Sequence, residues 1–389
     1  MRNFISGFAA VALFTTPLFS GGWETGRLDS AFMYEDGGYG QIGALSVNYD
    51  VGATIQYPSP EHKMAKDQQR TAFALKMGIG DFDIGLTQYH SGAIQLDGQG
   101  GNLDGCNPAT EAIALCSVVP SADVTIYTTS LLAKYSLNEN LSVFGGLSRF
   151  ALGDSTVTTI AGYYAVDSKT ENVMVYGAAY EISDIALRIE AVIQEEKTTS
   201  LAASSSLSPL LPTTPITGAS YTIPETMTLN FQSGIAENTL LFGSVHRQNW
   251  DTAQIVIPAN PAGINPVTFA ADTPVSSVGS SFSNKTSYSL GVGRKLSDKL
   301  SVSVSYSRED GGGATTDDPF TLSDGSQGIT VGARFSVSDD MTISAGYNYT
   351  TAGDVNVVHE VAPGIPSGLT ADYKDNSTSA VGLRIAFNF

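Results

Sequence analysis

Apolar and polar residues alternate with a period of two along most of the chain after Tyr39. The clearest runs are Leu300, Val302, Val304 and Tyr306, which serines separate, and Met341, Ile343, Ala345 and Tyr347. Successive side chains of a β-strand point to opposite faces, so one face of each run meets apolar surroundings and the other meets water. The pattern predicts an all-β protein.

The alternation divides the chain into about fourteen strand segments. They are 39–57, 70–79, 82–91, 122–136, 140–151, 170–181, 183–196, 225–235, 237–250, 283–296, 298–309, 325–336, 339–351 and 371–389. Such strands are long enough to cross the hydrocarbon layer of a membrane when they are tilted. Lipid cannot satisfy backbone polar groups, so strands that cross it must close into a barrel.

The joints between these segments alternate between tight turns and long loops. The tight turns are Gly80-Asp81, Asn138-Glu139-Asn140, Ser183-Asp184, Ala236-Glu237-Asn238, Ser297-Asp298 and Asp339-Asp340. The long loops are 58–69, 92–121, 152–169, 197–224, 251–282, 310–324 and 352–370. Short turns at one end and long, outward-facing loops at the other are typical of bacterial outer-membrane barrels. We therefore expect a transmembrane antiparallel β-barrel of about 14 strands, with tyrosines such as Tyr135, Tyr180, Tyr288 and Tyr349 near the membrane interfaces.

The N-terminus predicts export. Arg2 precedes an apolar run over residues 4–14, and Pro17 and Ser20 follow it, which is typical of a secretory signal peptide over residues 1–20. No later segment approaches the roughly 18 consecutive apolar residues of a membrane-spanning helix. We expect a short segment, 21–38, ahead of the barrel at 39–389.

The last strand gives the sharpest single signal. Its apolar positions are Val381, Leu383, Ile385, Phe387 and Phe389. A C-terminal strand that ends on phenylalanine resembles the assembly signal of bacterial outer-membrane barrels. The barrel-assembly machinery is therefore an expected partner, with Phe389 as the terminal contact.

Composition and charge agree with a barrel. Charged residues make up 15% of the chain and there are 40 glycines. The formal net charge of -18 argues against nucleic-acid binding and against attraction to anionic lipid. Cys106 and Cys116 lie close together, and in the oxidising periplasm we expect them to form a local disulfide.

No group of residues predicts an enzyme. The histidines His62, His90, His246 and His359 have no cysteine or carboxylate at metal-ligand spacing. No nucleophile elbow is present either. We expect no catalytic residues, no cofactor and no metal.

Several segments resemble the FadL/TodX family of outer-membrane transporters for hydrophobic compounds. They are 21–27 (GGWETGR), 34–39 (YEDGGY), 224–231 (PETMTLNF), 240–242 (LLF) and Asn249-Trp250. The resemblance implies a fourteen-stranded barrel with an N-terminal hatch, and transport of compounds such as long-chain fatty acids. The chain departs from the family at this hatch, because only residues 21–38 precede the first strand and Asn107-Pro108-Ala109 lies inside a long loop.

The family resemblance also implies a kinked third strand that opens sideways into the membrane. The predicted third strand, 82–91, contains Gly85. Glycine within a strand can mark a bulge or bend. Gly85 is thus a candidate for this kink, although glycine is common throughout the chain.

The alternation assigns basic residues to the lumen. Lys76, Arg188, Arg334 and Arg384 each alternate with apolar neighbours that would face lipid. A charge at mid-bilayer depth on the lipid side is expensive, so these side chains are expected to face inward. They are candidates for binding a fatty-acid carboxylate, and the alternative is that they pair with lumenal acids such as Glu190.

The loop 197–224 is unusually apolar for an exposed loop. Its leucines Leu201, Leu207, Leu210 and Leu211 form either a capture surface for hydrophobic ligands or a cap that packs on neighbouring loops. The loop 310–324 carries an acidic cluster, Glu309, Asp310, Asp317, Asp318 and Asp324. This cluster is a solvated loop or a site for divalent cations near lipopolysaccharide.

The sequence thus predicts a monomeric outer-membrane barrel, with lipid and lipopolysaccharide around it, that passes hydrophobic or amphipathic molecules such as long-chain fatty acids. The route would be passive and driven by binding. A general diffusion porin for small polar solutes and a structural or adhesive barrel are the alternatives.

Overall fold

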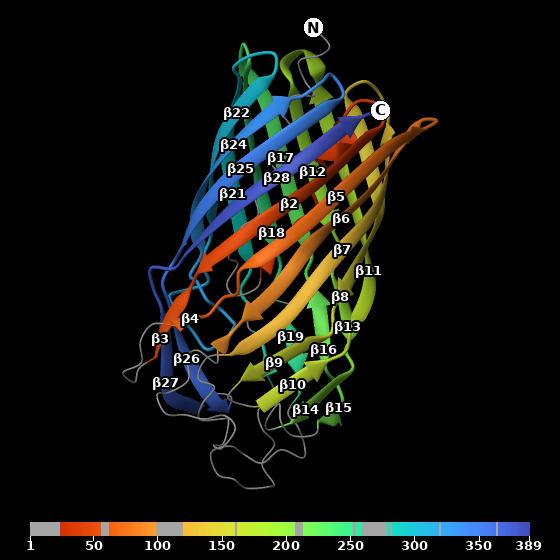
Figure 1. The fold of residues 1–389 in the computed structure, drawn as a ribbon. Coiled ribbons are helices and arrows are strands. Elements are labelled where there is room, and N and C mark those ends of the chain that lie inside the picture. Colours follow the sequence, from red (N-terminus) through yellow and green to blue (C-terminus); the bar gives the residue numbers. More distant parts are fainter. Residues whose placement is uncertain are drawn as a thin grey trace.

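Fourteen antiparallel strands close into a barrel in the computed structural model (Figure 1). The structure describes residues 24–55, 62–98, 120–159, 162–206, 213–251, 254–258, 278–280, 282–318, 320–362 and 365–389. Around the barrel the strands are β2 (Tyr39–Asp50), β5 (Gln68–Ile79), β6 (Phe82–Leu96), β7 (Ser121–Ser136), β8 (Leu141–Leu152), β11 (Lys169–Ile182), β12 (Leu187–Gln194), β17 (Thr226–Ala236), β18 (Thr239–Gln248), β21 (Lys285–Lys295), β22 (Leu300–Glu309), β24 (Ser326–Ser336), β25 (Met341–Ala352) and β28 (Ser377–Asn388). The predicted fold is confirmed.

The first and last strands close the barrel. β28 pairs with β2 from Tyr39↔Asn388 to Asp50↔Ser377. Beyond this ladder, the Phe389 N–H donates to the Gly38 carbonyl at 2.9 Å, and the Gly38 N–H donates to the Phe389 carbonyl at 3.1 Å. The chain therefore seals its own seam with backbone hydrogen bonds.

The alternation in the sequence corresponds to an outer apolar face and an inner polar one. Leu290, Val304 and Ile329 are 53%, 51% and 55% exposed on the outside, where a lipid layer would cover them. Tyrosines Tyr135, Tyr180, Tyr288 and Tyr349 also point outward. Inward positions between them are occupied mainly by small and polar residues. The period of two in the sequence therefore reports the two faces of the barrel wall.

The tight turns lie at the same end of the barrel as the C-terminus, and the long connections lie at the other end (Figure 1). These connections contain strands of their own, most of them inside the predicted long loops. They are β3 (Gly52–Ile55), β4 (His62–Lys63), β9 (Ser155–Thr159), β10 (Gly162–Val166), β13 (Lys197–Ser200), β14 (Ala203–Ser206), β15 (Thr214–Ile216), β16 (Ser220–Ile223), β19 (Ile255–Ile257), β20 (Val278–Gly279), β23 (Thr315–Thr316), β26 (Val355–Ala362) and β27 (Ile365–Tyr373). The long-loop end is therefore a folded cap.

The first predicted strand, 39–57, is wrong in its second half. β2 ends at Asp50, and β3 then pairs with β27 of the cap instead of a barrel strand. The alternation continues unbroken across this point, because Tyr49, Val51 and Ala53 are all buried. The alternation indicates which face of a strand is buried, but it does not indicate where the strand changes its partner.

Apolar side chains from the cap and from part of the lumen form a cluster at the long-loop end. The largest members of this cluster are Tyr49, Tyr164, Trp250 and Tyr373, each at most 2% exposed. Two short 3-10 helices complete the described elements, η3 (Ala31–Tyr34) and η6 (Ser183–Ile185), together with the N-terminal strand β1 (Glu24–Thr25). Within the described ranges, no helix is long and apolar enough to cross a membrane.

Candidate functional site: the lumen and its N-terminal segment

The segment that precedes β2 lies inside the barrel, near the short-turn end. Phe32 and Met33 of η3 are 2% and 0% exposed, and they belong to an apolar cluster that also contains lumen-facing Leu132 and Val175. Gly85 of β6 lies directly beside them, since a Cβ on Gly85 would be 2.1 Å from Met33 Sδ and 2.8 Å from Phe32 Cε2. Gly85 therefore provides space for η3.

Glu190 of β12 joins this segment to the barrel wall. Its carboxylate accepts hydrogen bonds from Ser30 Oγ at 2.7 Å, Tyr34 Oη at 2.9 Å and Asn230 Nδ2 at 2.8 Å. Glu190 is 2% exposed, and a buried charge is tolerated only when hydrogen bonds satisfy it. Two of the three donors come from the segment, so burial of Glu190 depends on the segment being in place.

Two lysines hold the end of η3. Lys134 Nζ of β7 donates to the Met33 carbonyl at 2.6 Å, and Lys76 Nζ of β5 donates to the Glu35 carbonyl. Both lysines also pair with Asp83, at 3.1 and 3.6 Å. Because Asp83 balances part of their charge, these lysines bind backbone carbonyls without leaving two buried cations unpaired.

Glu35 is 7% exposed and lies within electrostatic range of four basic residues. They are the four predicted from the sequence, and Glu35 interacts electrostatically with Arg334, Arg384, Arg188 and Lys76. Arg384 also donates to Gln41 Oε1 at 3.1 Å. Arg188 donates to Gln232 and lies 4.4 Å from the centre of the Tyr34 ring. The residues come from four separate strands, so the barrel brings together positions far apart in sequence.

The ladder between β5 and β6 stops short of the long-loop end, and we call this break in the pairing of the wall the window. These strands pair only from Phe73↔Gln88 to Ile79↔Phe82, although both continue further. Beyond that point β6 pairs with the N-terminal strand β1 instead, through Thr25↔Gly92 and Glu24↔Ala93. β6 also bulges at Ser91 relative to β7. The kink expected near Gly85 in strand 82–91 is thus wrong in position, because the irregularity lies at Ser91 and Gly85 accommodates η3.

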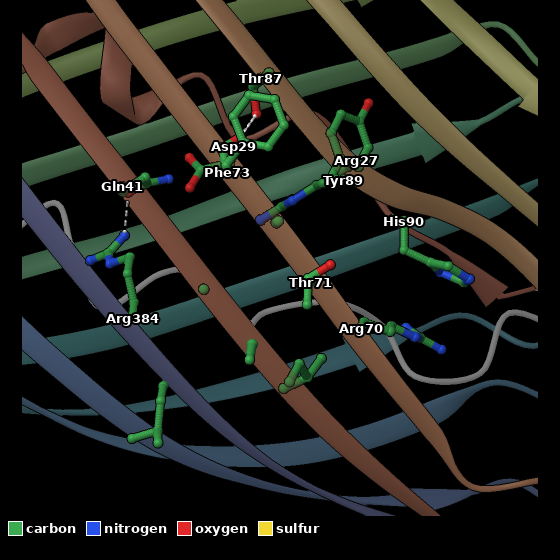
Figure 2. A pocket seen from close by; sticks show the side chains of 16 residues that line it. Arg27, Asp29, Gln41, Arg70, Thr71, Phe73, Thr87, Tyr89, His90 and Arg384 are labelled. Carbon is green, nitrogen blue, oxygen red and sulfur yellow. Dashed lines mark hydrogen bonds between the residues drawn. The ribbon is translucent and has the colours of Figure 1, made fainter.

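A cavity of about 140 Å³ adjoins this window. Figure 2 shows Arg70 and Thr71 of β5, Tyr89 and His90 of β6, and Arg27 and Asp29 of the segment around it. Outward-facing Phe73 and Leu383 also line it. The cavity therefore touches the lumen and the apolar outer face of the wall.

The remaining predicted residues lie elsewhere. Leu201 is 9% exposed and packs in the apolar cluster of the cap. Leu207, Leu210, Leu211, Cys106, Cys116 and the signal peptide at 1–20 lie outside the described residues. His246 bonds to Thr228 at 2.7 Å, and His90 packs edge-on against Tyr127. Within the described residues, no three potential metal ligands cluster.

Sequence reasoning missed three residues of the site. Glu35 and Arg27 belong to a segment without alternation, so no facing could be assigned to them. Lys134 follows Leu132 at a spacing of two, and both face the lumen. Alternation could have predicted the position of Lys134. If Leu131 and Tyr135 in strand 122–136 face lipid, then Lys134 faces the lumen.

The comparisons with known proteins agree with the fold. The family described as "Protein of unknown function (DUF1302)" matches residues 23–389. No curated protein matches the chain. Among solved structures, a Pseudomonas aeruginosa FadL homologue is 12% identical with a TM-score of 0.70, covering 97% of this chain and 94% of that one. The Ralstonia pickettii toluene transporter TbuX is 11% identical with a TM-score of 0.59 and covers 99% of both chains.

The Pseudomonas putida toluene transporter TodX is similar at 12% identity and a TM-score of 0.58, covering 98% of this chain and 94% of that one. Identities this low establish a common fold and no more. The predicted resemblance to FadL/TodX barrels is confirmed at this level.

Proposed function

This chain belongs to the DUF1302 family, and from its FadL-like fold we propose that it is an outer-membrane channel for hydrophobic compounds, with carboxylate-bearing amphiphiles such as long-chain fatty acids as substrates. The exported chain would begin after residue 20, and the segment 21–38 would act as its hatch. Transport would be passive and driven by binding. We propose a monomer within the lipid and lipopolysaccharide of the outer membrane.

The observation that carries the substrate class is the surroundings of Glu35. The buried Glu35 side chain lies within electrostatic range of Arg334, Arg384, Arg188 and Lys76, which four separate strands contribute. A site that holds one carboxylate in a largely buried position has the charge needed for another. We propose that the substrate head group replaces Glu35 when the segment moves, so that Lys76, Arg188, Arg334 and Arg384 bind it in turn.

The substrate has two possible exits from the lumen, one through the wall and one past the N-terminal segment. The window between β5 and β6 leads sideways toward lipid and is occupied by β1. Movement of η3 would open the short-turn end. Capture at the other end would use apolar residues of the cap, with Leu201, Leu207, Leu210 and Leu211 as candidates.

A second substrate class is favoured by the size of the cavity beside the window. Its volume is about 140 Å³. An apolar cavity of about 150 Å³ accommodates benzene. The similar structures of TodX and TbuX are described as toluene transporters. Small aromatic hydrocarbons are therefore the second candidate.

The test compares uptake of labelled oleate by cells with and without the protein. Expression of the protein should raise uptake, and the double variant Arg334→Gln/Arg384→Gln should lower it by about tenfold, because charge-assisted hydrogen bonds to the head group are lost. Arg294→Gln is the matched control, since Arg294 is an exposed arginine on the outer face of β21. Its uptake should equal that of the unmodified protein.

Conductance in planar bilayers tests the two alternative functions. A large steady conductance that oleate does not alter would identify a general diffusion porin. A barrel that neither conducts nor raises uptake would leave the structural or adhesive alternative.

A further inference from the structure

Four of the fourteen barrel strands have a lumen face that is almost free of apolar side chains. The consecutive strands β21, β22, β24 and β25 are described in full, and apart from Ala352 at the end of β25 their inward positions hold only glycine, serine, threonine, asparagine and charged residues. On β22, for example, these positions are Ser301, Ser303, Ser305, Ser307 and Glu309. We call the inward face of these four strands the hydroxyl wall.

The opposite side of the lumen is apolar near the long-loop end. β7, β8 and β11 contribute Ile126, Phe150, Leu152 and Val173 to the apolar cluster at the long-loop end. The hydroxyl wall contributes none of the buried residues of that cluster. The lumen therefore offers an apolar surface and a polar surface side by side.

A chain of cavities follows the hydroxyl wall. An open cavity of about 400 Å³ at the long-loop end shares Arg308, Glu309 and Ser326 with a narrow inner cavity of about 20 Å³. The inner cavity ends at Arg27, which also lines the cavity beside the window. That cavity reaches Arg384, one of the residues around Glu35 (Figure 2).

Charged groups are spaced along this path. Glu309 lies at its outer mouth, Arg27 at its centre and Arg384 at its inner end. Glu309 at the mouth is 3% exposed, and its Oε2 accepts from Ser287 Oγ at 2.8 Å. Its Oε1 has no hydrogen-bond partner among the described residues. A buried carboxylate oxygen in this condition indicates a place for a further hydrogen-bond donor.

We infer that the hydroxyl wall is a track for the polar head group of an amphiphile whose apolar chain follows the opposite side of the lumen. This inference rests on the proposed function. The head group passes from the mouth at Glu309, along Ser289 and Ser307, to Arg27 and then to the site near Glu35. The inner cavity has room for little more than one water molecule. Passage therefore requires Arg27, and with it the N-terminal segment, to move.

The test removes hydroxyl groups from the track without changing its width. Valine and threonine have the same shape, and only threonine keeps the hydroxyl. The variants Ser289→Val/Ser307→Val and Ser289→Thr/Ser307→Thr are therefore matched for bulk. We expect the valine pair to lower oleate uptake about tenfold relative to the threonine pair, because the carboxylate loses its hydrogen-bond donors. Uptake of toluene, which has no head group, should be equal in both.

Each other result overturns the inference. Equal oleate uptake by the two pairs would show that the hydroxyls do not contact the head group. An equal loss of toluene uptake would show a general blockage. Swelling of glycerol-loaded liposomes that the valine pair stops, with oleate uptake unchanged, would identify a path for polar solutes. If the unmodified protein takes up neither compound, the proposed function itself fails.

Discussion

The Gly85→Val barrel is expected to conduct ions far more than the unmodified protein. A Cβ at this position meets both Met33 and Phe32, which are fully packed and have no free space to enter. Overpacking of this kind costs about 1–3 kcal/mol, and the ratio of undocked to docked segment would rise roughly 5- to 150-fold. Single-channel recording in planar bilayers measures the open fraction directly.

The matched control is Gly40→Val on β2. Gly40 also lies near the short-turn end, but a Cβ there would have no neighbour closer than Leu75 Cδ1 at 3.8 Å. The Gly40 variant should conduct like the unmodified protein. Equal conductance of the Gly85 variant and the unmodified protein would show that the segment does not close the barrel.

Deletion of Phe389 is expected to reduce the amount of folded barrel in cells severalfold. The residue makes two backbone hydrogen bonds with Gly38, each worth about 0.5–1.5 kcal/mol. If the terminal phenylalanine is also read by the assembly machinery, the loss in cells should exceed the loss during refolding into detergent micelles. Heat-modifiable migration on gels measures the folded fraction in both settings.

Phe389→Ala separates the ring from the backbone. This variant keeps both hydrogen bonds to Gly38 and loses only the aromatic side chain, which is 69% exposed. It should refold normally in micelles and assemble poorly in cells. Normal assembly in cells would exclude recognition of the ring.

The barrel could be predicted from the sequence because the facing of each strand residue depends on its immediate neighbours along the chain. Lipid on one side and a wet lumen on the other force a period of two, which most barrel strands keep and which β6 loses at its bulge. The same dependence on neighbouring residues explains the error at Val51, where the alternation continues while the partner strand changes. The shortest strands of the cap, such as β4 and β20, could not be predicted, because two residues cannot show a period.

The site was predicted in part for the same reason. Lys76, Arg188, Arg334 and Arg384 were assigned to the lumen by their apolar neighbours, but their common neighbour Glu35 could not be identified. Glu35 reaches them only through a three-dimensional path of the segment. The role of Gly85 could not be predicted either. The sequence does not distinguish a glycine that accommodates a neighbouring side chain from a glycine that bends a strand.

The reciprocal bonds between Gly38 and Phe389 also link the closure of the wall to the position of the inner segment. Gly37 has a φ of 62°, in the left-handed region that glycine adopts easily, and it lies between η3 and the seam. Because the residue that closes the barrel sheet directly follows the inner segment, a shift in the register of the seam would displace that segment as well.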